Sequence, residues 1–263
     1  MQQQGLVKLA FGAILTQAIK LPVTHGLTCI KLALPLIVSL LVVIFGFFSL
    51  TDFSQISEPS REPFAFAASL LAAFFIFCCF VMMIVGWHQV FILKGASPKI
   101  WRWEAEERRF FVYSIAICLL FVLIFTPGLL FLLPLFFTDS QGMVSDAFAF
   151  AVIGLVGLGF VLFMFLLPRV LLVLPATAVS NNVGIGGAWR LTKGNTLALF
   201  ALLILIPGIA NAILESFAGL AGFIALLTIP VTFYLYAVEV ALLSLCYKAI
   251  TSEVNQKKPI DEQ

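Results

Sequence analysis

The stretch from Ala147 to Pro168 reads AFAFAVIGLVGLGFVLFMFLLP and contains no charged residue. A transmembrane helix needs about 20 predominantly apolar residues to cross about 30 Å of hydrocarbon. Apolar side chains occupy every side of this stretch, whereas a strand of a membrane β-barrel would alternate apolar and polar residues. The stretch therefore predicts a helix that spans a membrane.

Similar uncharged runs lie on both sides of this stretch. They are 32–51, 63–93, 110–138, 194–214 and 216–238, the last continuing past Glu239 to Tyr247. The chain is 62% hydrophobic and only 11% charged, whereas soluble domains are about 45–50% apolar and about 25% charged. We therefore predict an all-α, polytopic membrane protein with a six-helix transmembrane bundle over residues 32–247. The net charge of +2 gives no sign of a nucleic-acid partner.

The basic residues predict how the spans are oriented. If the N-terminus is cytoplasmic, all of the 15 lysines and arginines except Arg61 fall on the cytoplasmic side or at its boundary. This asymmetry follows the positive-inside rule. Both termini are thus predicted to face the cytoplasm, with residues 248–263 forming a cytoplasmic tail.

Residues 1–31 precede the first long run and show a helical pattern. Lys8, Gly12, Thr16 and Lys20 form one narrow polar stripe, and the positions between them are mostly apolar. This pattern predicts an amphipathic helix over residues 5–20 that lies in the membrane interface. A frayed cytoplasmic tail is the alternative.

The second and third spans resemble the fourth and fifth in plan. Each pair flanks a basic loop with a Trp-Arg dipeptide, and each returning span carries Pro-Gly. The dipeptides are Trp101-Arg102, Trp189-Arg190, Pro127-Gly128 and Pro207-Gly208. Because proline removes a backbone hydrogen bond, we expect a kink or break at Pro127-Gly128 and at Pro207-Gly208. Transporters often have such interrupted helices, and ordinary membrane bundles tolerate them too.

The loops between the spans carry two further patterns. Residues 101–109 read WRWEAEERR, which favours a short interfacial helix with a Glu104–Arg108 pair and a self-paired, solvated charged face. Residues Gly184 to Gly187 are glycine-rich, and we interpret them as the flexible start of a short helix that stops at Gly194.

The sequence lacks recognisable catalytic motifs. Only two histidines occur, His25 and His88, and the five cysteines have no spacing typical of metal ligands. No nucleotide-binding, serine-hydrolase or zinc-protease motif is found. The chain is thus not expected to be an enzyme, and no metal or cofactor is expected to bind.

Three polar residues stand out on the spans that run from outside to inside: His88, Arg169 and Glu239. An unpaired carboxylate in a membrane is costly, so such groups usually face a partner or a wet cavity. We therefore predict an intramembrane polar cluster in which Arg169 pairs with Glu239 near the cytoplasmic face, with His88 close by. The cluster either braces the helices or lines a cavity open to the cytoplasm.

The stretch from Arg169 through Leu174-Pro175-Ala176 to the segment AWRLTKGN, residues 188–195, carries a family resemblance. It resembles a six-span bacterial membrane domain that is fused to some glycerophosphodiester phosphodiesterases, and stand-alone inner-membrane relatives of no assigned function. The resemblance implies a bacterial cytoplasmic-membrane protein. The chain lacks the phosphodiesterase domain and its acidic and histidine residues, so no catalytic residue carries over.

These observations lead to two functional hypotheses. The first is a non-catalytic membrane protein that acts as a scaffold, anchor or accessory subunit in lipid or envelope homeostasis, with membrane lipids and a membrane protein as partners. The alternative is a transporter or lipid-handling channel with a polar cavity open to the cytoplasm. Ordered lipid or solute in an internal cavity would favour the alternative.

Overall fold

The computed structural model describes residues 9–50, 62–93, 95, 100–137, 146–181, 183–218 and 223–256. Helices are the only regular elements among these residues, which confirms the predicted all-α fold. Six helices are long and apolar enough to cross a membrane, as expected for a multi-pass membrane protein. They cover Gly26–Gly46, Phe66–Ile92, Ala105–Thr126, Phe150–Ala178, Thr196–Phe217 and Leu227–Ser252.

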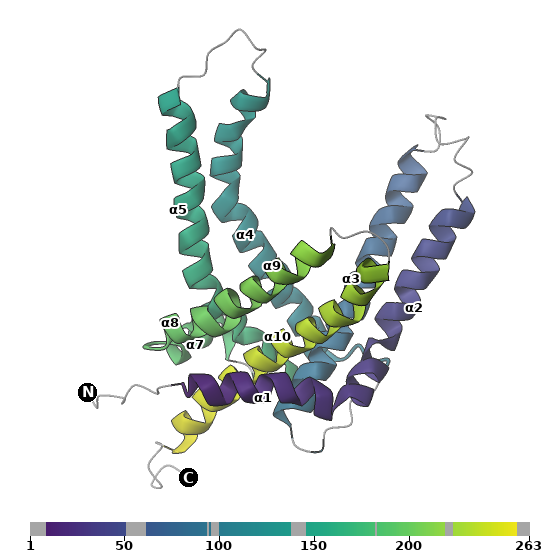
Figure 1. Ribbon diagram of the computed structural model, residues 1–263, viewed down its shortest axis with the longest axis vertical. Coiled ribbons are helices and arrows are strands. Elements are labelled where there is room, and N and C mark those ends of the chain that lie inside the picture. The colour runs from purple at the N-terminus through teal and green to yellow at the C-terminus, as the bar shows by residue number, and fades with distance from the viewer. Residues whose placement is uncertain are drawn as a thin grey trace.

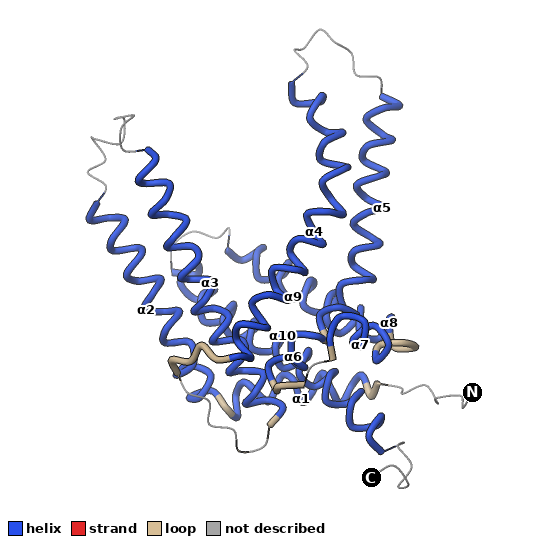
Figure 2. Tube along the Cα trace, turned by 180° about the vertical axis from the view of Figure 1, so that it is seen from behind, coloured by secondary structure: helices blue, strands red, loops and turns tan. Residues whose placement is uncertain are grey.

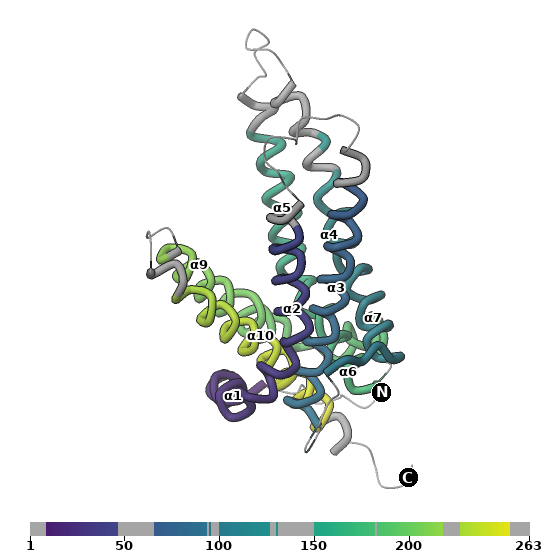
Figure 3. Tube along the Cα trace, turned by 90° about the vertical axis from the view of Figure 1, so that its right-hand side faces the viewer, coloured from purple at the N-terminus to yellow at the C-terminus, as the bar shows by residue number. Residues whose placement is uncertain are grey.

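The six spans form three helical hairpins. Helix α2 (Gly26–Leu50) packs against α3 (Glu62–Ile92), and α4 (Ala105–Phe137) packs against α5 (Asp146–Leu171). The third hairpin joins α9 (Ile206–Ala218) to α10 (Phe223–Gln256). The first two hairpins diverge from a shared end of the molecule (Figure 1), and α9 and α10 tilt away from both (Figure 3). We call this shared end, where α3 ends and α4 begins, the basal end.

An N-terminal helix lies across the basal end. Helix α1 (Phe11–Thr24) runs across the direction of α2 and packs against α10 (Figure 1). Its side chains Ile14 and Ala18 are buried, whereas Gly12, Thr16 and Lys20 are exposed, as the predicted polar stripe requires. Residues 1–8, with the fourth member of that stripe, lie outside the described residues.

Helix α2 begins at Gly26, before the boundary predicted after residue 31. The prediction started the span at the last lysine, but Lys31 lies within α2 with its side chain exposed. A long lysine side chain can extend along a helix and keep its charge outside the apolar region. Residues 248–256 of the predicted cytoplasmic tail are helical, because α10 continues to Gln256.

Short helices fill the basal end between the hairpins. Helix α6 (Val173–Ala178) lies against α3, α4 and α10, followed by α7 (Gly184–Leu191) and α8 (Thr196–Phe200). Figure 2 shows them at the lower ends of α4 and α5. Val173, Ala176 and Ala178 are wholly buried, and these small side chains let α6 approach its neighbours closely.

The short helix α7 agrees with the sequence pattern. It begins at Gly184, whose φ is 64°, and the turn that follows it contains Gly194 with a φ of 87°. Glycine adopts this left-handed conformation without the steric cost that a side chain brings. A short helix is therefore present as predicted, but it contains the glycine-rich residues 184–187, and it ends at Leu191, before the turn that holds Gly194.

The two Pro-Gly pairs behave differently. Before Pro207, residues Ala201–Leu205 form a π-helical turn, in which the Ile206 N–H donates to the Ala201 carbonyl. Proline has no N–H to donate to the carbonyl of residue 203. The hydrogen bonds just before it therefore change from the α-helical to the π-helical spacing. In α4, by contrast, the α-helix continues through Pro127 and Gly128, and the break considered there does not occur. Tertiary packing in membranes commonly tolerates proline within a helix.

Candidate functional site

The three residues of the predicted polar cluster have separate partners. Arg169 contacts residues of α7, Glu239 bonds to α9, and His88 bonds to α10. Among the described residues, no ion pair joins Arg169 to Glu239, and the expected pair is therefore corrected. The cause is the path of the chain: α7 packs on the foot of α5, whereas α9 packs along α10 and supplies a partner for Glu239.

His88 and Ser244 form a buried pair between α3 and α10. The His88 Nδ1 lies 2.7 Å from the Ser244 Oγ, and both residues are almost completely buried. The Ser244 hydroxyl also donates to the Val240 carbonyl at 2.8 Å, so it can accept the Nδ1–H of His88. Because the pair reaches no solvent, its geometry fits a brace between two helices.

Further hydrogen bonds tie α6 and the segment after it to the same two helices. The Gln89 Nε2 donates to the Ala178 carbonyl at 3.0 Å, and the Asn181 Nδ2 donates to the Tyr247 hydroxyl at 2.7 Å. Gln89 lies on α3 and Tyr247 on α10. Gln89 is buried, so breaking its bond would leave a donor without water, whereas Asn181 is exposed and can bond to solvent instead.

The charged segment 101–109 starts α4 and forms no separate interfacial helix, since α4 begins at Ala105. Arg102 pairs with the glutamates of this segment, and the predicted Glu104–Arg108 pair is not found among the described residues. The Arg102 guanidinium lies 3.6, 3.1 and 3.3 Å from carboxylate oxygens of Glu104, Glu106 and Glu107. Glu107 is buried and accepts the Glu104 N–H at 2.8 Å. Glutamate at this helical position commonly reaches back to the start of its helix, which competes with pairing further along.

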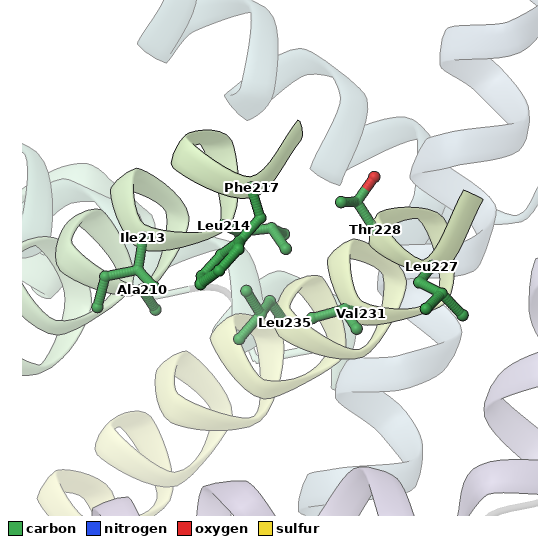
Figure 4. A pocket seen from close by; sticks show the side chains of 8 residues that line it. All are labelled: Ala210, Ile213, Leu214, Phe217, Leu227, Thr228, Val231 and Leu235. Carbon is green, nitrogen blue, oxygen red and sulfur yellow. The ribbon is translucent and has the colours of Figure 1, made fainter. Parts of the chain in front are cut away.

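A groove of about 490 Å³ lies between α9 and α10. Figure 4 shows Leu214 and Phe217 of α9 pointing toward Leu235 of α10. The lining is apolar apart from one threonine hydroxyl. It consists of Ala210, Ile213, Leu214, Phe217, Leu227, Thr228, Val231 and Leu235.

A polar pair joins the same two helices one turn from this groove. The Asn211 Nδ2 donates to the Glu239 Oε1 at 2.8 Å. Glu239 follows Leu235 by four residues, and Asn211 precedes Leu214 by three, so each shares a helix face with the groove lining. An apolar hollow beside a few polar groups is typical of sites that bind small amphiphilic molecules.

Asn211 is the functional candidate that the sequence analysis missed. Charge alone favoured Arg169 as the partner of Glu239, although a carboxylate can equally accept a hydrogen bond from an amide. A signal was present, because Asn211 is an uncharged polar residue within an apolar span, four residues after Pro207. Such residues often bond to neighbouring helices.

Arg169 lies at the foot of α5 and contacts two residues at the end of α7. Its guanidinium carbon is 3.9 Å from the centroid of the Trp189 ring, and its Nε donates to the Thr192 hydroxyl at 3.2 Å. A guanidinium over an indole face is attracted by the ring electrons. Within the segment that carried the family resemblance, these contacts join Arg169 to Trp189 and Thr192.

The described residues contain no group of three or more His, Cys, Asp or Glu side chains that could hold a metal ion. The five cysteines are all free, and Cys29, Cys79 and Cys246 are buried. This burial agrees with a packing role for them.

Neither a family model, nor a curated protein, nor a solved structure matches this chain. The resemblance to the membrane domain of glycerophosphodiester phosphodiesterases therefore depends on residues 169–195 and the order of the spans.

Proposed function

We propose that the chain is a non-catalytic membrane protein that acts as a scaffold, anchor or accessory subunit for another membrane protein, in lipid or envelope homeostasis. Its site is the bacterial cytoplasmic membrane, with the basal end and both termini in the cytoplasm. The distribution of lysine and arginine supports this orientation. Reporter fusions after Lys248 and within residues 53–62 test it, and periplasmic activity of the first fusion would contradict it.

The observation that supports a scaffold is the exposed surface of α5. Leu155, Leu158 and Val161 are exposed there, and a Cβ added at Gly154 or Gly157 would meet nothing within 4 Å. Helices associate in membranes through small residues that let backbones approach closely. Gly154 and Gly157 lie three residues apart on one face, so the occupant we propose is a transmembrane helix of a partner protein.

Bulky substitutions on this face test the scaffold function. Gly157→Leu should leave the chain folded, because the added side chain meets open space and leucine favours helix more than glycine does. It should remove a partner that co-purifies from native membranes with the unmodified chain. Gly46→Leu is the matched control, because Gly46 on α2 also faces open space. A partner that is lost equally with both variants would contradict the proposed face.

The groove between α9 and α10 favours a second candidate function, the handling of a membrane lipid. The apolar lining suits an acyl chain, and the Asn211–Glu239 pair lies one turn away on the same helix faces. Ala210→Phe should fill part of this groove and reduce the amount of lipid that co-purifies. Ala212→Phe is the matched control, since Ala212 is exposed and does not line the groove. Equal lipid content in the two variants would reject this candidate.

A further inference from the structure

The surface of helix α1 is divided into rows of different chemistry. Residues four apart in a helix lie above one another on one face, so each row can have a single character. Ile14, Ala18 and Pro22 form a buried row on the side of α1 that packs against α10. The adjoining row is apolar but largely exposed, and it consists of Phe11, Leu15, Ile19 and Val23. The row beyond it is polar and exposed, and it consists of Gly12, Thr16, Lys20 and Thr24.

The orientation of these rows is fixed by contacts with other helices. The Tyr234 hydroxyl of α10 donates to the Ile19 carbonyl at 2.8 Å, and the Leu9 N–H donates to the Asn195 Oδ1 at 3.4 Å. Figure 3 shows α1 nearly end-on beside α10. Because its buried row already packs on α10, α1 cannot also turn its apolar row toward the protein. The apolar row therefore remains available to an outside partner.

The apolar row leads directly onto the surface of the first membrane span. Val23 and Leu27 lie on either side of the junction between α1 and α2, and each is 69% exposed. Ile30 and Leu34 continue this exposed apolar surface within the span Gly26–Gly46. The outer surface of a membrane span meets acyl chains, so the row that joins it lies at the edge of the same lipid layer.

Exposed tryptophans mark the basal end as the level of the membrane interface. Trp101 and Trp103 precede α4, and they are 61% and 42% exposed. Tryptophan is enriched at the headgroup level because its ring is amphipathic. Helix α1 lies across this same end of the molecule (Figure 1). The apolar and polar rows of α1 thus lie where acyl chains meet headgroups.

The charges beside the apolar row are positive. Lys20 is exposed and precedes Val23 by three residues, so the two side chains are neighbours on the helix surface. Lys31, near the start of α2, is exposed as well. The sequence contains no aspartate or glutamate before Asp52. A cationic border along an apolar row is complementary to lipids with anionic headgroups.

We propose that α1 binds anionic phospholipids of the bilayer, with acyl chains against the apolar row and Lys20 among the headgroups. The sequence pattern predicted an interfacial helix only. The structure divides its apolar side between α10 and lipid, and it adds the charge preference. This inference does not depend on either proposed function, because α1 belongs neither to the α5 face nor to the α9–α10 groove.

Photo-crosslinking from single positions tests which side of α1 meets lipid. The full chain carries p-benzoylphenylalanine in place of Val23, or in place of Gln17, which lies beyond the polar row. Both side chains are exposed, so both variants should fold. Each is reconstituted in vesicles of equal phosphatidylcholine and phosphatidylglycerol, illuminated, and analysed by mass spectrometry. We expect phospholipid adducts mainly from position 23. Equal lipid adducts from both positions, or a crosslink from position 23 to a second copy of the chain in place of lipid, would overturn the proposal.

The headgroups of the position-23 adducts test the preference for anionic lipid. A lysine near the membrane surface favours anionic lipid by up to about fivefold, so the adducts should contain more phosphatidylglycerol than phosphatidylcholine. Lys20→Gln should reduce this preference, and the chain should fold because glutamine suits a helix about as well as lysine does. Lys193→Gln is the matched control, because it removes an exposed charge from the turn after α7. It should leave the preference unchanged.

Three results would contradict the charge preference. The first is equal amounts of the two lipids in the adducts of the chain that retains Lys20. The second is an unchanged preference in the Lys20→Gln variant. The third is an equal loss with Lys20→Gln and Lys193→Gln, which would indicate attraction by net charge only.

Discussion

The guanidinium of Arg169 stacks on the indole ring of Trp189, with 3.9 Å between the guanidinium carbon and the ring centroid. Arg169 lies near the end of α5 and Trp189 near the end of α7. Together with the bond from the Arg169 Nε to the Thr192 hydroxyl, this contact fixes α7 against the foot of the fourth span. Arg169 therefore organises the turn that leads into the fifth span.

Arg169→Ala should lower the free energy of unfolding by about 1–3 kcal/mol, because it removes a cation–π contact and leaves Thr192 without a donor. Thermal and denaturant unfolding in detergent measure this change. Arg190→Ala is the control: Arg190 is exposed and should change stability by less than about 0.5 kcal/mol. Equal effects of the two variants would show that Arg169 acts through its charge alone.

Ser244→Ala should lower the free energy of unfolding by about 1–3 kcal/mol, because it leaves the buried His88 Nδ1 without a partner. Replacing His88 by Phe in the same chain should recover part of this loss, since both polar groups are then absent. A double-mutant cycle of the four chains measures the coupling. Strictly additive effects would contradict a direct bond between the two side chains.

Glu239→Gln should change the free energy of unfolding by less than about 1 kcal/mol, because glutamine keeps an oxygen that accepts the Asn211 amide. Glu239→Leu should lower it by about 1–3 kcal/mol, since Asn211 then loses its acceptor. An Arg169–Glu239 ion pair would have made the glutamine variant costly. Unfolding in detergent distinguishes the two arrangements, and a large loss with Gln would favour the ion pair.

Arg102→Ala should lower the free energy of unfolding by about 3–5 kcal/mol, because it leaves the buried Glu107 carboxylate without its cation. The loss should persist at high salt, since ions screen buried pairs poorly. Arg108→Ala, an exposed neighbour, serves as the control and should have little effect. If the two variants are equally stable, Arg102 is not the cation that holds the start of α4.

The spans could be predicted because hydropathy is a local property. A run such as 147–168 has no charged side chain. Because a bilayer offers no water to its backbone N–H and carbonyl groups, these groups must bond to one another, and a helix allows this within the run itself. Local patterns also predicted the short helix α7 and placed a glycine in the turn after it, where Gly194 adopts a left-handed conformation. The ends of helices were less predictable, as the early start of α2 at Gly26 shows. A single lysine interrupts a count of apolar residues without interrupting a helix.

The partners of the polar residues could not be predicted in the same way. The sequence marks Glu239 as an unusual group within a span, but it contains no direct sign of which helix face lies opposite. Opposite charge predicted Arg169 as the partner of Glu239. The packing of α9 along α10 instead places the neutral Asn211 against Glu239. Likewise, Ser244 lies 156 residues from His88, and only the packing of α3 on α10 brings the two together.

By itself, the amino-acid sequence determined the class of this protein: an all-α chain with six membrane-spanning helices, because each span satisfies its backbone within its own residues. Tertiary structure alone decided that the spans form three hairpins on a shared basal end, and that Arg169, Glu239 and His88 have separate partners. Such contacts join residues distant in the chain, and they depend on how whole helix faces pack and not on any local pattern.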